Sequence, residues 1–298
     1  MKNFNLSYIV ATRNRLPFLK ITLEKLVSGL LLDEEIVVVD GDSNDGSKEY
    51  LQALFDKGRI HQFVSEPDKN QAHAWNKAML LARGTIIKKI IDDDVFCYKA
   101  IRECKNHMLL NPEVDVVISN DLGVSLEHYK NINRQGRLAQ FEEWKNGTKP
   151  SFTFGDVHML VRRSSLAFIG LYNTGFVMMD WEYSLRISYL NANIAYYTGY
   201  NALNVAHPQT VTASRDIKLI EEQGKRGCVF YEYPGDASEI SLWSKIKIMG
   251  GKLVKPVSKH AGQLNYGPVE DMAAKYDYLY NYIAEVNNAQ PFMFLKKN

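Results

Sequence analysis

Three consecutive aspartates, Asp92, Asp93 and Asp94, directly follow an apolar run at residues 85–91. A β-branched run of this length is typical of a buried strand, so the acid cluster is expected at its carboxyl end. Three like charges there repel one another, and burying an unpaired carboxylate is costly. A divalent cation such as Mg²⁺ or Mn²⁺ would relieve both costs, because it accepts carboxylate oxygens as ligands. On spacing alone, a solvated acidic turn that caps the next helix fits equally well.

The segments around the acid cluster alternate between strand-like and helix-like patterns. Apolar runs predict strands at residues 6–12, 35–40, 60–65, 85–91 and 115–119. Helical spacing and capping residues predict a helix that begins at Pro17, a helix that is capped by Ser47 and ends before Gly58, and further helices over residues 71–83 and 99–110. Strands separated by helices indicate βαβ units and a largely parallel sheet, whose ligands bind at the carboxyl ends of the strands. We therefore expect Thr12, Asp40, the loop after Ser65 and the three aspartates along one sheet edge.

Beyond residue 120 the pattern is weaker. Residues 122–151 are rich in charged and amide side chains and have no clear period, whereas order returns at residues 152–163 and in a helix-like segment at 181–190. After Ser214 the signal fades again. The exception is a tail with several residues on one helical face, which are Met272, Tyr276, Leu279, Tyr280 and Ile283. We interpret this tail as packing against the rest of the chain or as a self-association face, which leaves a homo-oligomer open.

The composition excludes several classes of protein. Of the 298 residues, 46% are hydrophobic and 23% are charged, as in an ordinary soluble globular chain. The 36 basic and 34 acidic residues give a net charge of +2, which does not support nucleic-acid binding. Three cysteines without a CxxC pair indicate a reducing compartment. Because there is no signal-peptide core and no apolar stretch of ~18 residues, we expect a cytoplasmic protein. A peripheral contact at the inner face of the membrane is left open.

Several segments, in a shared order, resemble the family 2 glycosyltransferases, which have the GT-A fold and use nucleotide-sugar donors. Residues 9–15 (IVATRNR) are similar to the family's opening strand and turn, and residues 38–47 (VVDGDSNDGS) to its second-strand signature. SEPDK at 65–69, AWNKA at 74–78 and ARG at 82–84 are similar to the stretch before the metal motif, and IDDD at 91–94 occupies the DxD position. MDWEYSLR at 179–186 resembles the acceptor-side motif that supplies the catalytic base. Ile91 and Met179 depart from the pattern, since many relatives carry a polar or acidic residue there.

The resemblance implies an α/β fold of the GT-A type, with a Rossmann-like, mostly parallel central sheet flanked by helices and a C-terminal helical extension. It implies a glycosyltransferase domain over residues 1–215 and a partly helical extension at 216–298. Within the domain, residues 1–120 would form the nucleotide-sugar-binding half and 121–215 the acceptor-binding half. The implied activity is that of an inverting, metal-assisted hexosyltransferase acting on a hydroxyl of a glycan or a lipid-linked saccharide. Such a reaction belongs to polysaccharide or lipid-linked oligosaccharide biosynthesis.

The same resemblance assigns the donor and metal roles. Asp92 and Asp94 are the expected ligands of Mn²⁺ or Mg²⁺, and His207 would complete the metal site as in some GT-A enzymes. Asp93, together with Asp92, would support the site or contact the donor ribose. The nucleotide pocket would include Thr12, Arg13, Asp40 and Asp68. A carboxylate at Asp40 can accept the imide hydrogen of uracil, so a UDP-sugar is the preferred donor, with guanosine and thymidine donors left open.

Asp180 is the expected general base, which would take the proton of the attacking hydroxyl. Glu182 is the reserve base or a contact to acceptor hydroxyls. Each assignment has a structural alternative, because Asp180 can cap a helix, His207 can be a packed structural histidine and Asp68 can belong to a plain charged loop. Two other classes of protein also fit part of the sequence. One is a catalytically inactive glycan- or nucleotide-binding module on the same fold, and the other is a phosphotransfer receiver, which also gathers aspartates at a sheet edge but is much shorter.

Overall fold

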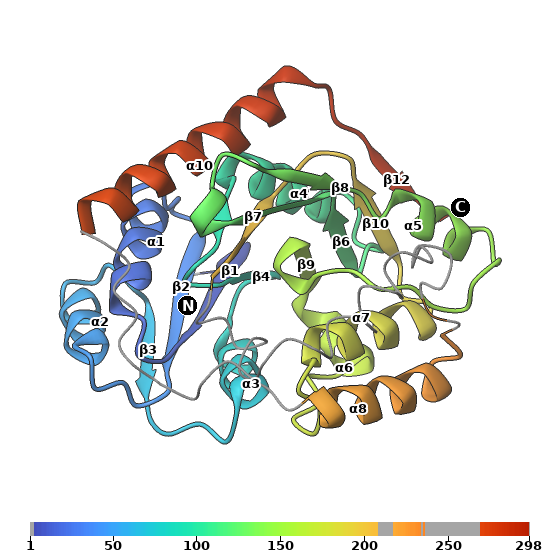
Figure 1. Ribbon diagram of the computed structural model, residues 1–298, viewed down its shortest axis with the longest axis horizontal. Coiled ribbons are helices and arrows are strands. Elements are labelled where there is room, and N and C mark those ends of the chain that lie inside the picture. The colour runs from blue at the N-terminus through green and yellow to red at the C-terminus, as the bar shows by residue number, and fades with distance from the viewer. Residues whose placement is uncertain (1–2, 208–216, 234, 236–268, 298) are drawn as a thin grey trace, which may run out of the picture.

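The computed structural model describes residues 3–207, 217–233, 235 and 269–297. Its main feature is an eight-stranded sheet with the order β12-β10-β6-β9-β4-β1-β2-β3 (Figure 1). The strands are β1 (Leu6–Thr12), β2 (Glu34–Asp40), β3 (Gln62–Ser65), β4 (Ile86–Ile90), β6 (Val116–Ser119), β9 (Met159–Arg162), β10 (Ile194–Tyr197) and β12 (Phe294–Lys296). β9 and β12 run antiparallel to the other strands. The mostly parallel α/β sheet expected from the sequence is therefore confirmed.

The strand register brings the expected loops to one edge of the sheet. Thr12 at the end of β1 pairs with Asp40 at the end of β2, and Asp40 pairs with Ser65 at the end of β3. On the other side of β1, Val10 pairs with Ile90, so the chain leaves β4 at the same edge. The three aspartates after β4 thus lie beside the loop that follows β1.

A second, four-stranded sheet with the order β5-β11-β7-β8 stands beside this edge. Its strands are β5 (Val95–Phe96), β7 (Asp121–Ser125), β8 (Asn133–Gln135) and β11 (Ala202–Ala206). β11 pairs with both β5 and β7, and this pairing brings its residues back to the segment that follows the aspartates. The sequence pattern over residues 122–151 did not predict this sheet.

Helices cover both faces of the large sheet (Figure 1). Alternate residues of β1 separate the two faces, because Leu6, Tyr8 and Val10 join one hydrophobic cluster and Ile9 joins the other. Helices α1, α4 and α10 contribute to the first cluster and α3, α5 and α7 to the second. The α-helices are α1 (Leu16–Ser28), α2 (Ser47–Asp56), α3 (Gln71–Leu81), α4 (Tyr98–Leu110), α5 (Leu138–Lys145), α6 (Leu166–Ile169), α7 (Met179–Tyr189), α8 (Ile217–Phe230) and α10 (Val269–Ala289).

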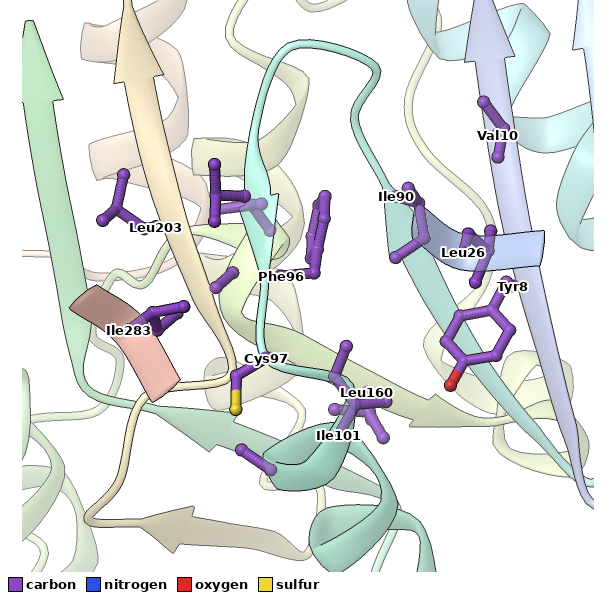
Figure 2. Close-up of a cluster of buried hydrophobic side chains, with 14 of the residues drawn as sticks. Tyr8, Val10, Leu26, Ile90, Phe96, Cys97, Ile101, Leu160, Leu203 and Ile283 are labelled. Atoms are coloured by element: carbon purple, nitrogen blue, oxygen red, sulfur yellow. The ribbon is translucent and has the colours of Figure 1, made fainter. Parts of the chain in front are cut away.

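The carboxyl-terminal helix α10 is an integral part of the first cluster. Figure 2 shows Ile283 of α10 in the same group of buried side chains as Leu203 of β11 and Phe96 of β5. Met272, Tyr276, Leu279 and Ile283 are all buried, as the helical face in the sequence predicts. No helix among the described residues is both long and apolar enough to cross a membrane. The predicted domain boundary at residues 215 and 216 lies outside the described residues.

Three element boundaries differ from the sequence-based expectation. The residue before α2 is Gly46, with a positive φ of 93°, so Ser47 is the first helical residue rather than the cap. The Asp45 carboxylate accepts the Ser47 backbone N–H instead. Helix α3 ends at Leu81, and Arg83 is drawn away by hydrogen bonds from its N and Nε to the buried Glu35. Helix α7 already begins at Met179, which places Asp180 inside its first turn.

Candidate active site

A cavity of about 640 Å³ opens at the carboxyl edge of the parallel strands. Its wall comes from the loops after β1 and β4, the segment before α3, the start of α7, and β11. Of the ten residues expected to form a site, seven line this cavity, which are Thr12, Arg13, Asp68, Asp92, Asp93, Asp94 and Asp180. Glu182, Asp40 and His207 do not line it. The volume is in the range of small-molecule and cofactor sites.

The carboxylates of Asp92 and Asp93 are held by the loop after β1. Thr12 Oγ1 donates a hydrogen bond of 2.6 Å to Asp92 Oδ2. The Arg15 guanidinium forms an ion pair with Asp93 and lies 3.6 Å from Asp92. His207 Nε2 lies 2.7 Å from the same Asp93 carboxylate, and its ring stacks on Phe18 with the ring centres 4.8 Å apart. His207 therefore touches the acid cluster from behind the wall of the cavity.

Asp94 is held from the second sheet. The Val205 backbone N–H donates to Asp94 Oδ1 at 2.7 Å, and the Asn204 amide lies 3.2 Å from that oxygen. Two backbone carbonyls of the acid loop are also fixed, since Thr22 Oγ1 donates to the Asp92 carbonyl and the Tyr276 hydroxyl donates to the Asp93 carbonyl. The loop is thus tied to α1, β11 and α10 at once.

The environment of the cluster favours a cation. Burial, followed by the charge of Asp93, raises the pKa of Asp92 to about 7 and that of Asp94 well above its usual range. Burial opposes ionisation of Asp93 as well, but His207 and Arg15 outweigh it and hold the pKa of Asp93 below its ordinary value. No group of three His, Cys, Asp or Glu side chains in the described part of the chain is arranged as a ready metal site. The carboxylates of Asp92 and Asp94 nevertheless fit a hard divalent cation, because both are oxygen donors whose ionised forms it would favour.

At the loops after β1 and β3, Arg13 and Asp68 line the cavity on either side of Gly41. A Cβ at Gly41 would lie 3.2 Å from Arg13 Cδ and 3.3 Å from Asp68 Oδ2, so the glycine lets the two side chains approach the turn closely. Asp68 lies 2.8 Å from Lys77 Nζ. Asp40 is fully buried next to Gly41, and its carboxylate accepts hydrogen bonds from the hydroxyls of Ser43 and Ser65 at 2.5 and 2.7 Å.

Asp180 differs from the other carboxylates of the cavity in its partners. In the described structure its oxygens accept no hydrogen bond from a side chain and form no ion pair, whereas each of the other five carboxylates in the wall has at least one partner among those residues. Burial, followed by the charge of Asp156, raises the pKa of Asp180, and Lys89 opposes this rise. The neighbouring Glu182 is occupied, because it pairs with Arg186 at 3.0 Å and accepts the Tyr231 hydroxyl at 2.5 Å.

Three residues of the wall, Arg15, Lys89 and Asp156, were not predicted as site residues from the sequence. Arg15 was given no role of its own in the sequence analysis, yet its guanidinium reaches the acid cluster. Lys89 Nζ lies 2.6 Å from Asp156 Oδ2 beside Asp180. The signal for Lys89 was present in the sequence, since Lys88 and Lys89 interrupt a strand whose residues are otherwise isoleucines, and every residue of that strand is buried.

Comparison with known proteins gave two kinds of match. The model of the family described as Glycosyl transferase family 2 matches residues 7–170, more than half of the chain. None of the curated proteins compared with the chain matches it. Among solved structures, TarS 1-349 from S. aureus in complex with UDP-GlcNAc is 14% identical with a TM-score of 0.55, over 96% of this chain and 92% of that one. The mannosyltransferase PcManGT from Pyrobaculum calidifontis, in complex with GDP-Man and Mn²⁺, is 17% identical with a TM-score of 0.55, over 96% and 87%. At these identities the likeness shows a shared fold.

Proposed function

The chain belongs to glycosyl transferase family 2, and from that premise we propose that it transfers a sugar from a nucleoside-diphosphate sugar to a hydroxyl group of an acceptor. The observation that carries the proposal is the contrast among the carboxylates of the cavity. Five are held by side-chain donors or cations of the described chain, while Asp180 faces the cavity without a partner of either kind. A carboxylate that accepts no hydrogen bond from a side chain can take a proton from a hydroxyl placed beside it.

The donor would lie along the loops after β1, β2 and β4. The solved structures with the same fold include complexes with UDP-GlcNAc and GDP-Man, which supports a nucleotide sugar as the donor class. Thr12, Arg13 and Asp68 would border the nucleotide, and Arg15 lies where it can offset the charge of the diphosphate. Uridine stays the predicted base. Asp40 is fully buried and does not line the cavity, so a direct contact to the base requires the turn at Gly41 to move, and we expect Asp40 to shape the pocket as well as to bind.

Asp92 and Asp94 are the residues that would hold a divalent cation, with Asp93 and His207 supporting them from behind. A bound Mn²⁺ or Mg²⁺ supplies Lewis-acid stabilisation of the departing diphosphate. The chain's own contribution is to keep the carboxylates in place through Thr12, Val205 and Tyr276, and to confine the departing group in the cavity.

The transfer would follow a single displacement with inversion. The acceptor oxygen forms a bond to the anomeric carbon while the bond from that carbon to the diphosphate oxygen breaks. The hydroxyl proton passes to a carboxylate oxygen of Asp180. Within this scheme we propose a hexose as the transferred sugar and a glycan or lipid-linked saccharide as the acceptor, at the cytoplasmic face of the membrane.

The test uses the purified full chain with a panel of UDP-, GDP- and dTDP-hexoses, in the presence of Mn²⁺, Mg²⁺ or EDTA. Thermal unfolding reports donor binding, since a ligand bound to the native state raises its stability. Release of the nucleoside diphosphate reports turnover. We expect one nucleotide class to raise Tm and to be turned over, with methyl hexopyranosides increasing the rate. If no donor changes Tm and none is turned over, the proposed function is wrong.

A further inference from the structure

Asp156 is a second carboxylate near Asp180, and none of the roles above uses it. It lies in a one-turn segment, Asp156–His158, directly before β9, where it lines the cavity although only 3% of the residue is exposed. Its Oδ2 accepts hydrogen bonds from Lys89 Nζ at 2.6 Å and from the Tyr172 hydroxyl at 2.7 Å. Its other oxygen, Oδ1, accepts none from the residues that the structure describes. Asp156 is thus fixed through Oδ2, and Oδ1 is available to accept a hydrogen bond from a ligand.

The partners of Asp156 are themselves enclosed. Lys89 is 4% exposed, and its ammonium lies 4.4 Å from the centre of the Trp75 ring and 5.4 Å from that of Tyr172. A buried ion pair contributes little net stability, because the cost of desolvating both charges offsets their attraction. Apolar side chains of similar size would serve a core at least as well. The pair at this wall is therefore better explained by ligand recognition than by folding.

Asp156 and Asp180 also line the same cavity. After burial, the charge of Asp156 is the largest cause that raises the pKa of Asp180. Among the described residues, the charged and titratable groups that act on Asp180 are Asp156, Lys89 and Tyr172. Both carboxylates line the same cavity, so an acceptor whose reacting hydroxyl lies at Asp180 can place a neighbouring group at Asp156.

We propose that Asp156 Oδ1 accepts a hydrogen bond from a second hydroxyl of the acceptor, and that Lys89 and Tyr172 position Asp156 for this contact. The inference rests on the proposed transfer to an acceptor hydroxyl. An ionised carboxylate accepts hydrogen bonds but does not donate them, so the group it binds must carry a hydrogen. An anionic group at this position would be repelled by both carboxylates. The acceptor is accordingly a sugar or polyol with a free hydroxyl near the one that reacts, rather than a simple alcohol or a phosphorylated end.

The first test needs only the wild-type chain. Methyl hexopyranosides and 1-propanol are compared as acceptors with the donor that is turned over, and the best glycoside is then replaced by its monodeoxy analogues. We expect a higher kcat/KM for the glycoside than for 1-propanol. One monodeoxy analogue, which lacks a hydroxyl other than the reacting one, should have a kcat/KM about 10- to 100-fold below that of its parent glycoside. A glycoside no better than 1-propanol, or a deoxy series that loses less than about threefold at every non-reacting position, overturns the inference.

The second test assigns the lost contact to Asp156. In Asp156→Asn the Lys89 ammonium should retain the amide oxygen, so the group that replaces Oδ1 is an NH₂ that accepts no hydrogen bond. The same deoxy analogue should then lose less than about twofold in kcat/KM relative to its parent glycoside. In Asp56→Asn, which changes an exposed aspartate at the end of α2, the full 10- to 100-fold penalty should remain. An equal deoxy penalty in Asp156→Asn and in the wild type contradicts the assignment. A wild-type chain that turns over no nucleotide sugar instead refutes the proposed function itself, which keeps the two failures apart.

Discussion

Thr12 Oγ1 donates a 2.6 Å hydrogen bond to Asp92 Oδ2, across 80 residues of sequence. Thr12 ends β1 and Asp92 follows β4, and the two strands are parallel neighbours in the large sheet. The bond therefore joins the nucleotide side of the cavity to the acid cluster at the point where the strands end. Arg15 strengthens the connection, because its guanidinium faces both Asp92 and Asp93.

The position of Lys89 leads to a prediction about pH. Burial and Asp156 raise the pKa of Asp180, and Lys89 opposes that rise. A general base acts in its ionised form, so kcat/KM should fall as the pH drops through the pKa of Asp180. Lys89→Met removes a positive charge that favours the ionised carboxylate, and it should move this acidic limb to higher pH. Lys25→Met, an exposed control on α1, should leave the limb in place. A limb that stays or moves to lower pH in Lys89→Met contradicts the prediction.

The burial of Lys88 leads to a prediction of how the free energy of unfolding depends on pH. Its ammonium is fully buried and donates to the carbonyl of Val157 and to Asn201 Oδ1, and burial lowers the pKa of Lys88 from 10.5 to about 7. Between these two values the unfolded chain binds more protons than the folded one, so stability rises with pH there. The unfavourable contribution is complete below about pH 7 and is lost as the pH approaches 10.5.

Urea unfolding at pH 7, 8 and 9 measures this effect. The free energy of unfolding of the wild type should gain up to about 1.4 kcal/mol per pH unit relative to Lys88→Met, which cannot titrate at this position. Parallel pH profiles for the two proteins would show that Lys88 does not titrate in this window.

Asp94 should be required for metal-dependent stabilisation. At a metal and donor concentration about 100 times Kd, a specific ligand stabilises the native state by about 2.7 kcal/mol. We expect this increment in the wild type and its loss in Asp94→Asn, because the amide is a much poorer ligand than the carboxylate. Addition of EDTA should remove the increment from the wild type, so that neither protein is stabilised by metal and donor. Asp42→Asn, at an exposed turn, should keep the increment, and an equal increment in Asp94→Asn would exclude Asp94 as a ligand.

Tyr276 couples the carboxyl-terminal helix to the acid loop. Its hydroxyl donates to the Asp93 carbonyl at 2.6 Å, and the residue is fully buried. Tyr276→Phe leaves that carbonyl without this donor and should lower the free energy of unfolding by about 1–3 kcal/mol. Tyr278→Phe, on the exposed face of the same helix, should change it by less than about 0.5 kcal/mol. Equal effects of the two changes in chemical denaturation would contradict a structural role for the Tyr276 hydroxyl.

The elements that position the site follow from local sequence patterns. β1 and β2 contain apolar runs, and β4 is a run of isoleucines interrupted by Lys88 and Lys89. The parallel order of the strands then brings Thr12, Asp40 and Asp92 to one edge. The antiparallel direction of β9 could not be predicted in this way. The strand has only four residues, and their sequence does not say which strands it will pair with. The second sheet was missed for a similar reason, since its strands are two to five residues long.

The side-chain partners inside the site depend on contacts between distant segments. Lys89, Asp156 and Tyr172 meet although 67 residues separate the first two, and no periodicity encodes that meeting. Asp40 was correctly expected at a strand end, but its bonds to Ser43 and Ser65 required the three-dimensional structure. The roles given to Asp92, Asp94, His207 and Asp180 stay predictions until variants are measured.

The most direct measurement compares Asp180→Asn with the wild type, using the donor that is turned over and saturating Mn²⁺. If Asp180 is the base of a sugar transfer, kcat/KM should fall by about 10²- to 10⁴-fold. The rise in Tm caused by the donor should persist, because Asp180 lies outside the proposed nucleotide pocket. A rate within about fivefold of the wild type would contradict the assignment of the base. A wild-type chain that binds the donor but never releases nucleoside diphosphate would instead identify the protein as a binding module without catalytic activity.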